Sequence, residues 1–329
     1  MRATNAQELL FQRIREMIPP DISLVDAISE SLRVSSDSAY RRIRGETPLV
    51  LDEVNALCDQ YRLSMDVVLQ LNSHHTLFRN IHVSRDEYNY ETYLTDLVKQ
   101  VKTIGGFLYK DITYLTKDLP IFHNFYFEPL VAFRYFFWMK TLMRHPDFKN
   151  RDYDAGCVPA GIHELSRELV IEYCRIPSTE IWNTECINTA IMQVEFYRDS
   201  GYFSSASEAR IIYDALEETL VHVKKQVEKG CKFMPGSASM GARFNFFYNR
   251  VILGDNTVLV TTDHQKSVFL NYNVLNYITT NDIGFCEQCS QDIQNIQKGS
   301  TMISQTSEKQ RNIFFEILLA KISERKKQL

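Results

Sequence analysis

The sequence predicts a mainly α-helical protein with an N-terminal five-helix bundle, a helical middle region and a small α+β unit at the C-terminus. Three observations lead to this fold class. Apolar residues recur at helical spacing through most of residues 5–71 and again through 90–229. After Gly230 the pattern changes to alternating aromatic and β-branched residues, which is typical of strands. The 329 residues also exceed the ~250 at which single cores stop growing, so about two domains are expected.

Composition and charge narrow the class of protein. Hydrophobic residues make up 44% of the chain and charged residues 24%, as in ordinary folded proteins rather than disordered ones. The formal net charge of −4 argues against a nucleic-acid coat or a membrane-surface protein. The N-terminus lacks the apolar core of a signal peptide, because Glu8, Arg13 and Arg15 interrupt it. The seven cysteines, an odd number, favour reduced thiols, and we therefore expect a cytoplasmic protein.

The first two elements are expected to be short amphipathic helices. The first helix ends before Pro19 and Pro20, because proline removes a backbone donor and restricts the residue before it. Ser23 can cap the second helix, which presents one apolar face up to Leu32.

A third helix follows the short break Arg33-Val34-Ser35. Ser35 or Ser36 can cap its start, and Gly45 ends it, as glycine commonly does just past a helix end. The two helices on either side of this break have the spacing of a helix-turn-helix, in which one helix braces the backbone and the next presents side chains to the major groove of DNA. The runs LVLDEVNALCDQY and LSMDVVLQL then predict the fourth and fifth helices of a compact bundle.

A basic cluster lies in the third helix, which holds Arg41, Arg42 and Arg44. Ala39 and Ile43 lie four residues apart and are expected to share the face toward the bundle. Arg41 and Arg42 should therefore point outward. Arg44 should lie near the helix end, where it can reach backbone phosphates.

The run SSDSAYRRIRGETPLVLDEVNALCDQYRLS resembles the N-terminal domain of lambda-repressor/Cro-type transcriptional regulators, in particular the variant at the front of larger bacterial regulators with helical C-terminal regions. The likeness covers residues 5–71. The family usually has an acid between the last apolar residue and the basic residue before glycine, whereas Ile43 is followed directly by Arg44 and Gly45. The resemblance implies a dimeric helix-turn-helix regulator of double-stranded DNA. The DNA-binding residues that it implies are Ser36, Asp37, Ser38, Tyr40, Arg41, Arg42 and Arg44.

These residue types suit groove entry. Serine and aspartate at the helix start are compact enough to approach base edges or a phosphate, and arginine can bind guanine or phosphate through two N–H groups. Two alternatives remain. The arginines can be a solvated helix end that interacts with the helix dipole. Residues 1–71 also contain 8 Arg, no Lys and 11 Asp or Glu, a net of 8 − 11 = −3, which fits an adaptor that binds protein, or a regulator that needs dimerisation for tight DNA binding.

We divide the chain into a helix-turn-helix domain at 1–72, a linker at 73–89, a helical dimerisation or sensor region at 90–230 and an α+β region at 231–329. The apolar run FYFEPLVAFRYFFWMKTLM predicts a buried helix rather than a membrane span, because charged residues interrupt it. We expect no membrane partner. His123, Glu128 and Arg134 are polar groups that a pocket for a small-molecule effector could use.

The last region is expected to contain a hairpin and two helices. RFNFFYNRVILGDNTVLVTT predicts two strands around the turn signal Gly254-Asp255-Asn256, and Ser267 to Leu270 predicts a further strand. The runs SQDIQNIQ and EKQRNIFFEILLAKISERK predict helices.

No catalytic, metal or cofactor site is expected. Cys286 and Cys289 have the spacing of half a zinc site, but two partly buried thiols are the simpler interpretation. The stretch from His264 and Lys266 to Asn271 resembles the H-x-K-x4-D signature of the phospholipase D-like superfamily, with Asn in place of Asp. A phosphodiesterase-like enzyme in the C-terminal region is therefore the last-ranked alternative.

Overall fold

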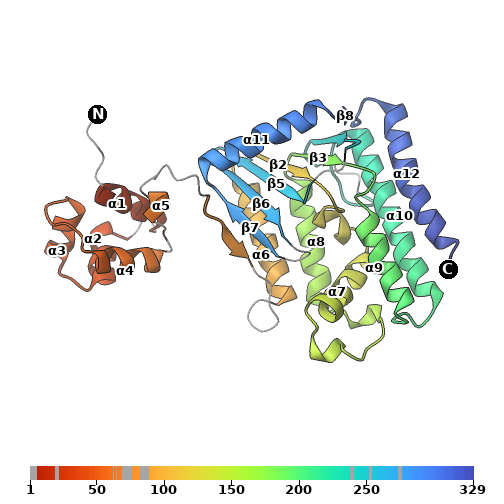
Figure 1. Cartoon of the computed structure of the whole chain (residues 1–329), viewed down its shortest axis with the longest axis horizontal. Helices are drawn as coiled ribbons and strands as arrows, with labels where there is room; N and C mark the ends of the chain where they lie inside the picture. Colours follow the sequence, from red (N-terminus) through yellow and green to blue (C-terminus); the bar gives the residue numbers. More distant parts are fainter. Residues whose placement is uncertain are drawn as a thin grey trace. The chain divides into compact units, whose positions relative to one another are not determined.

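A computed structural model gives the fold of the chain, which divides into two compact units, Met1–Leu77 and Phe78–Leu329 (Figure 1). The structure describes residues 6–18, 22–61, 63, 65–68, 76–81, 89–237, 241–251, 254–272 and 276–329.

In its described residues, the N-terminal unit has four short helices and one helical turn around its own core. The elements are α1 (Ala6–Met17), α2 (Leu24–Leu32), α3 (Ser36–Ile43), α4 (Leu51–Tyr61) and α5 (Met65–Val68). The core consists of Leu10, Phe11, Ile14, Leu24, Ile28, Ala39, Leu57 and Val68. The predicted five-helix bundle is wrong in its last member, because α5 is a single turn of four residues, too short to count as a full helix. The predicted break at Pro19 and Pro20 lies outside the described residues.

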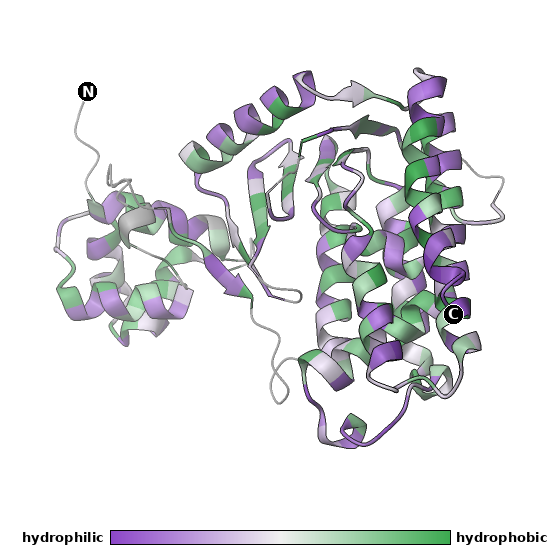
Figure 2. Cartoon of the chain, turned by 45° about the vertical axis from the view of Figure 1, so that its right-hand side comes forward, coloured by the Kyte–Doolittle hydropathy of each residue, from purple (hydrophilic) through white to green (hydrophobic). Residues whose placement is uncertain are grey.

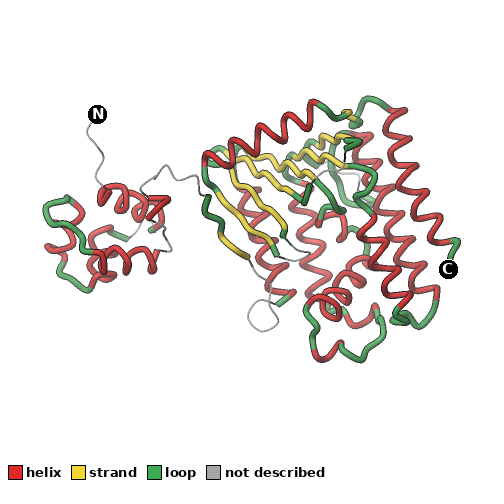
Figure 3. Tube along the Cα trace, viewed as in Figure 1, coloured by secondary structure: helices red, strands yellow, loops and turns green. Residues whose placement is uncertain are grey.

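The second unit contains one mixed sheet of eight strands within the described ranges (Figure 3). The strands are β1 (Arg79–Ile81), β2 (Lys110–Leu115), β3 (Ser178–Trp182), β4 (Phe244–Tyr248), β5 (Thr257–Thr262), β6 (Lys266–Asn271), β7 (Tyr277–Thr280) and β8 (Thr301–Met302). Their order is β1-β7-β6-β5-β2-β3-β4-β8. Strands β2, β3 and β4 are parallel, and the other pairs are antiparallel.

Helices cover both faces of the sheet (Figure 1). The helix α11 (Ile283–Lys298) lies on one face, and the larger helical layer lies on the other. That layer contains α6 (Tyr90–Gly106), α7 (Glu128–Phe137), α8 (Ala160–Cys174), α9 (Asn188–Asp199), α10 (Ala206–Lys229) and α12 (Glu308–Lys326). Short pieces complete it: the 3₁₀ turns η1 (Ile121–Phe125), η3 (Pro146–Phe148) and η4 (Ala155–Cys157), and the π-helical turn η2 (Trp138–Leu142).

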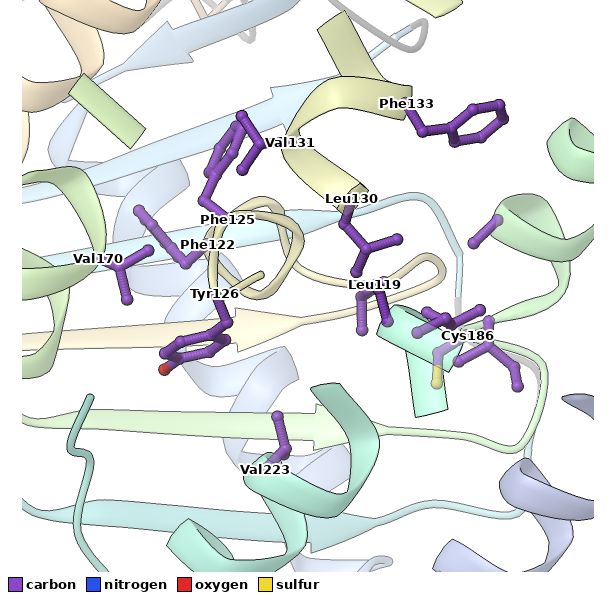
Figure 4. Close-up of a cluster of buried hydrophobic side chains, with 14 of the residues drawn as sticks. Leu119, Phe122, Phe125, Tyr126, Leu130, Val131, Phe133, Val170, Cys186 and Val223 are labelled. Atoms are coloured by element: carbon purple, nitrogen blue, oxygen red, sulfur yellow. The ribbon is translucent and has the colours of Figure 1, made fainter. Parts of the chain in front are cut away.

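Alternation along the strands decides which side chains enter which core. On β2, Tyr114 lies in the large core beneath the helical layer, whereas Leu115 lies in the small core beneath α11. On β3, Trp182 and Ile181 divide in the same way. Figure 4 shows part of the large core, where side chains from η1, α7, α8 and α10 meet. The helices of the second unit carry both hydrophobic and hydrophilic residues, and α11 and α12 carry many hydrophilic ones (Figure 2).

The fold class predicted for the second unit is wrong in two respects. The sheet is large rather than a small C-terminal unit, because β1, β2 and β3 come from the part of the chain expected to be a linker and a helical region. The predicted hairpin is also wrong in its pairing. Its two strands exist as β4 and β5, but β4 pairs with β3 and β8, whereas β5 pairs with β2 and β6.

Several predicted elements are confirmed. The strand expected at Ser267 to Leu270 is β6, and the last predicted helix is α12. The apolar run from Phe125 to Met143 forms the buried helix α7 and the turn η2. Among the described residues, no helix combines the length and the apolar character that a membrane crossing needs.

Candidate functional site

A three-residue turn joins α2 to α3 in the N-terminal unit. Arg33 ends α2 in the left-handed conformation, with φ 53° and ψ 43°. The amide of Val34 donates to the carbonyl oxygen of Ser29 at 3.0 Å, and the Ser29 hydroxyl donates back to the carbonyl of Val34. Ser35 then caps α3, because its Oγ accepts the N–H of Ser38 at 3.3 Å. The turn is therefore fixed by hydrogen bonds at both helix ends.

Helix α3 is held on the unit by its apolar face and by one polar side chain. Ala39 is fully buried and Ile43 packs against the core, as expected. Gln7 on α1 donates from Nε2 to the carbonyl of Arg42 at 2.6 Å and accepts the N–H of Leu49 at 2.9 Å. Sequence reasoning missed Gln7, since a glutamine on an amphipathic helix gives no sign of a tertiary contact. These bonds fix the C-terminal end of α3.

The outer face of α3 is polar and exposed. It presents Ser36, Asp37, Tyr40, Arg41 and Arg44. Their spacing places them on one side of a helix. Tyr40 is 48% exposed, and the guanidinium of Arg44 lies 5.5 Å from the centre of its ring. Five of the seven predicted DNA-binding residues therefore share one accessible face.

Arg42 and Ser38 lie elsewhere, and the expectation that Arg42 points outward is wrong. Arg42 Nη2 lies 2.7 Å from Oε1 of Glu53 on α4, and the two side chains are only 15% and 18% exposed. Arg42 Nη1 also donates to the hydroxyl of Ser38 at 2.6 Å. The hydrogen bond with Glu53 raises the pKa of Arg42, so this guanidinium stays charged. Arg42 belongs to the framework of the unit, since it ties α3 to α4.

Each of the three arginines has an acidic partner. Arg41 Nε lies 3.2 Å from Asp37, and Arg44 Nε lies 3.5 Å from Glu46. Both pairs are exposed, and exposed pairs contribute little to stability. A phosphate or base edge can therefore replace these partners at small cost, which is not true of the Arg42–Glu53 pair.

The second unit contains a buried polar centre around Glu180 on β3. Both carboxylate oxygens of Glu180 accept from Nε2 of His123, at 3.0 and 2.9 Å. The Tyr173 hydroxyl and the Trp182 indole N–H also donate to this carboxylate. Burial by itself raises the pKa of Glu180, but its interactions with His123 and Tyr173 outweigh burial and hold that pKa below its usual value. The centre links β3 to η1 and α8.

Lys232 lies beside this centre without a hydrogen-bond acceptor among the described residues. Its Nζ is 3.4 Å from the centre of the Tyr173 ring, and the residue is fully buried. Burial lowers the pKa of Lys232 to about 7. Sequence reasoning missed both Glu180 and Lys232. The one available sign of Glu180 was an acid directly before the apolar pair Ile181 and Trp182.

A pocket of ≈ 300 Å³ opens where β2 ends. Arg134, one of the three polar groups proposed for an effector pocket, lines it. The other two are placed differently. His123 points to Glu180, and Glu128 is exposed at the start of α7.

The other residues considered for chemistry do not come together. Lys266 pairs with Glu287 at 2.7 Å, and the ring of His264 packs on Phe107. Asn271 lines the pocket instead. Burial raises the pKa of the Cys286 thiol to about 11. Within the part of the chain that the structure describes, no group of three or more His, Cys, Asp or Glu side chains could hold a metal ion.

Comparisons of the chain with protein-family models, with curated proteins and with solved structures find no match.

Proposed function

We propose that the chain is a sequence-specific DNA-binding transcriptional regulator that acts in the cytoplasm, with α3 as its recognition helix. One observation carries the proposal. A tight, capped turn joins α2 to α3, and α3 buries Ala39 while it exposes a polar face that ends in Arg41 and Arg44. A recognition helix needs this division between an anchored face and a face free to enter the major groove.

The residues of α3 divide into two roles under this proposal. Ser36, Asp37 and Tyr40 contact base edges or the sugar-phosphate backbone near the start of the helix. Arg41 and Arg44 leave their exposed carboxylate partners and bind guanine or phosphate. Ser38 and Arg42 orient the helix through the bond to Glu53 and do not touch DNA.

We also propose that the second unit forms a dimer. A short recognition helix reads only a few base pairs, and two copies that bind half-sites one turn of DNA apart multiply affinity and specificity. The N-terminal unit has a net charge of −3, so its nonspecific attraction to DNA is weak, and tight binding requires two copies. Met192 and Phe196 lie four residues apart on α9 and are 65% and 47% exposed, which provides an apolar face for a second copy.

The test is selection of bound fragments from a random duplex library by the purified full-length protein, followed by measurement of affinity against salt concentration. We expect enrichment of a two-fold symmetric site and a steep fall of affinity with salt. The variant Arg41→Ala with Arg44→Ala should enrich nothing. A wild-type protein that enriches no sequence at low salt would contradict the proposal.

A second candidate function is a protein-interaction adaptor that keeps the helix-turn-helix without binding DNA. The acidic partners of Arg41 and Arg44 favour it, because they neutralise the exposed basic charge of α3. The same experiment separates the two functions. An adaptor shows no salt-dependent affinity for any duplex, and the Arg41 and Arg44 substitutions leave this result unchanged.

A further inference from the structure

The pocket in the second unit lies where the order of the strands reverses. The chain runs from β2 to β3 to β4 on one side of β2 and then crosses to place β5 on the other side. The pocket is lined by Tyr114 near the carboxyl end of β2, by Asn256 just before β5 and by Asn271 at the end of β6. In open, mainly parallel sheets, small molecules bind outside the carboxyl ends of the strands at such a reversal; here β2, β3 and β4 are parallel, whereas β5 is antiparallel to β2. This position is the first indication of a ligand site.

Arg134 brings a buried positive charge to this pocket. It is 9% exposed, and among the described residues no carboxylate pairs with it directly, although the nearby charge of Asp118 favours its charged form. Its Nε donates to Oδ1 of Asn124 at 2.9 Å, and its Nη1 donates to Oε1 of Gln193. These two neutral amides orient the guanidinium, but Nη2 donates to no described residue. Burial lowers the pKa of Arg134 to about 10, so the side chain remains charged at neutral pH.

A second unused donor lines the same pocket. Trp138 is 4% exposed, and its indole N–H has no acceptor among the described residues. The indole ring is held by edge contacts with the rings of Tyr90 and Tyr93. A buried polar group without a partner costs free energy, and Trp138, which lines the cavity beside Arg134, carries one such group.

The rest of the lining decides what kind of anion fits. Leu119, Ile121 and Phe125 supply an apolar wall. Asp118 also lines the pocket, but its carboxylate accepts the hydroxyl of Thr189 instead of forming an ion pair with Arg134. A ligand with an apolar body and one oxyanion group would satisfy both the wall and the unused donors.

We propose that this pocket binds a small organic carboxylate, whose oxygens accept from Arg134 Nη2 and the Trp138 indole N–H while its apolar part packs on Phe125 and Leu119. A guanidinium suits a carboxylate because its parallel N–H groups match the two oxygens. The volume of ≈ 300 Å³ limits the ligand to a small molecule. The site is independent of the proposed DNA binding, and it is tested without DNA.

The two tryptophans of the chain give a direct readout. Full-length protein labelled with ¹⁵N-tryptophan shows two indole N–H signals, which Trp138→Phe assigns. Benzoate and phenylacetate are titrated as probes, with benzamide and phenylacetamide as neutral controls of the same shape. The Trp138 signal should move with the carboxylates and not with the amides. The Trp182 signal should stay in place, because its N–H already donates to Glu180 at 2.7 Å.

Substitution of Arg134 then tests the charge. Arg134→Gln should weaken binding of the carboxylate probes by about tenfold or more, and Arg134→Lys should weaken it less. If Arg134→Gln does not fold, the Arg134→Lys variant and the titration of the wild type still test whether Arg134 binds the carboxylate. A Trp138 signal that ignores both carboxylates, or that moves equally with the amides, overturns the proposal. A response to inorganic phosphate without a response to the carboxylates overturns the assignment to an organic ligand.

Discussion

Arg42 belongs to the framework of the N-terminal unit, although it lies between the exposed residues Arg41 and Arg44. Its guanidinium is satisfied by Glu53 and Ser38 inside the unit, whereas Arg41, one residue earlier, has an exposed partner. Adjacent residues on a helix point about 100° apart, so Arg41 faces solvent while Arg42 faces α4.

We expect Arg42→Ala to lower the free energy of unfolding of the N-terminal unit by about 2 kcal/mol, because it leaves Glu53 half-buried without its charged donor. Urea denaturation followed by circular dichroism measures this change. Arg41→Ala is the matched control and should change stability by less than about 0.5 kcal/mol. Equal stability of the two variants would show that the Arg42–Glu53 pair contributes nothing.

Lys232 predicts a pH dependence of stability. Its pKa in the folded protein is about 7, below the ordinary value of 10.5, so between these values the unfolded chain binds one more proton than the folded chain. The free energy of unfolding should therefore rise with pH in this window. Between about pH 7 and about pH 9, wild type should gain about 2 kcal/mol relative to Lys232→Met.

Denaturation of both proteins at each pH measures the difference. Lys225→Met, a change at an exposed lysine of α10, serves as the control and should follow wild type. Parallel curves for wild type and Lys232→Met would mean that Lys232 keeps its proton in the folded protein.

At the scale of the element, the bounds of α3 were predicted correctly. Ser35, Gly45 and the apolar pair Ala39 and Ile43 are local signals, and they set the helix bounds correctly. The partner of Arg42 was not predictable in this way, because Glu53 lies eleven residues further along and the contact depends on how α3 and α4 pack.

The strands β2 and β3 were missed for a different reason. Both are central strands of five or six residues, KDITYL and STEIW, and their polar residues leave no continuous apolar run of the kind that predicts a buried strand. The pocket beside β2 was accordingly unpredictable, even though Arg134 had been noted, since its walls come from segments far apart in the sequence.

The exposed face of α3 leads to a prediction about DNA. Once a selected site is known, Arg41→Ala and Arg44→Ala should each weaken binding to it by about tenfold or more. If Arg44 binds a phosphate, its loss should also reduce the slope of log affinity against log salt concentration by about 1. If an arginine instead contacts a base, its loss should relax specificity at one base pair. Arg15→Ala on α1 is the control for removal of an exposed arginine. Full affinity in both α3 variants would exclude this face as the reading surface.

At the scale of the whole molecule, the proposed dimer connects the second unit to DNA affinity. Replacing Met192 and Phe196 together by glutamate should convert a dimer to a monomer, because two charges cannot be buried in an apolar interface. Sedimentation equilibrium measures the molecular mass of the wild type and of the double variant. The DNA affinity of the double variant should be lower than that of the wild type. Ile283→Glu, at an exposed position of α11, is the control. A wild-type monomer, or an unchanged mass in the double variant, would rule out this interface.

The central place of β2 has a consequence for how the chain acquires its fold. Its two neighbours, β3 and β5, begin about 70 and about 150 residues further along, so β2 cannot be paired on both sides until most of the second unit has been synthesised. Pairings between such distant segments form slowly, and an unpaired strand edge is prone to aggregation. The N-terminal unit, whose core lies entirely within Met1–Leu77, has no such delay. During translation the first unit can therefore be complete while β2 of the second unit still has unpaired edges.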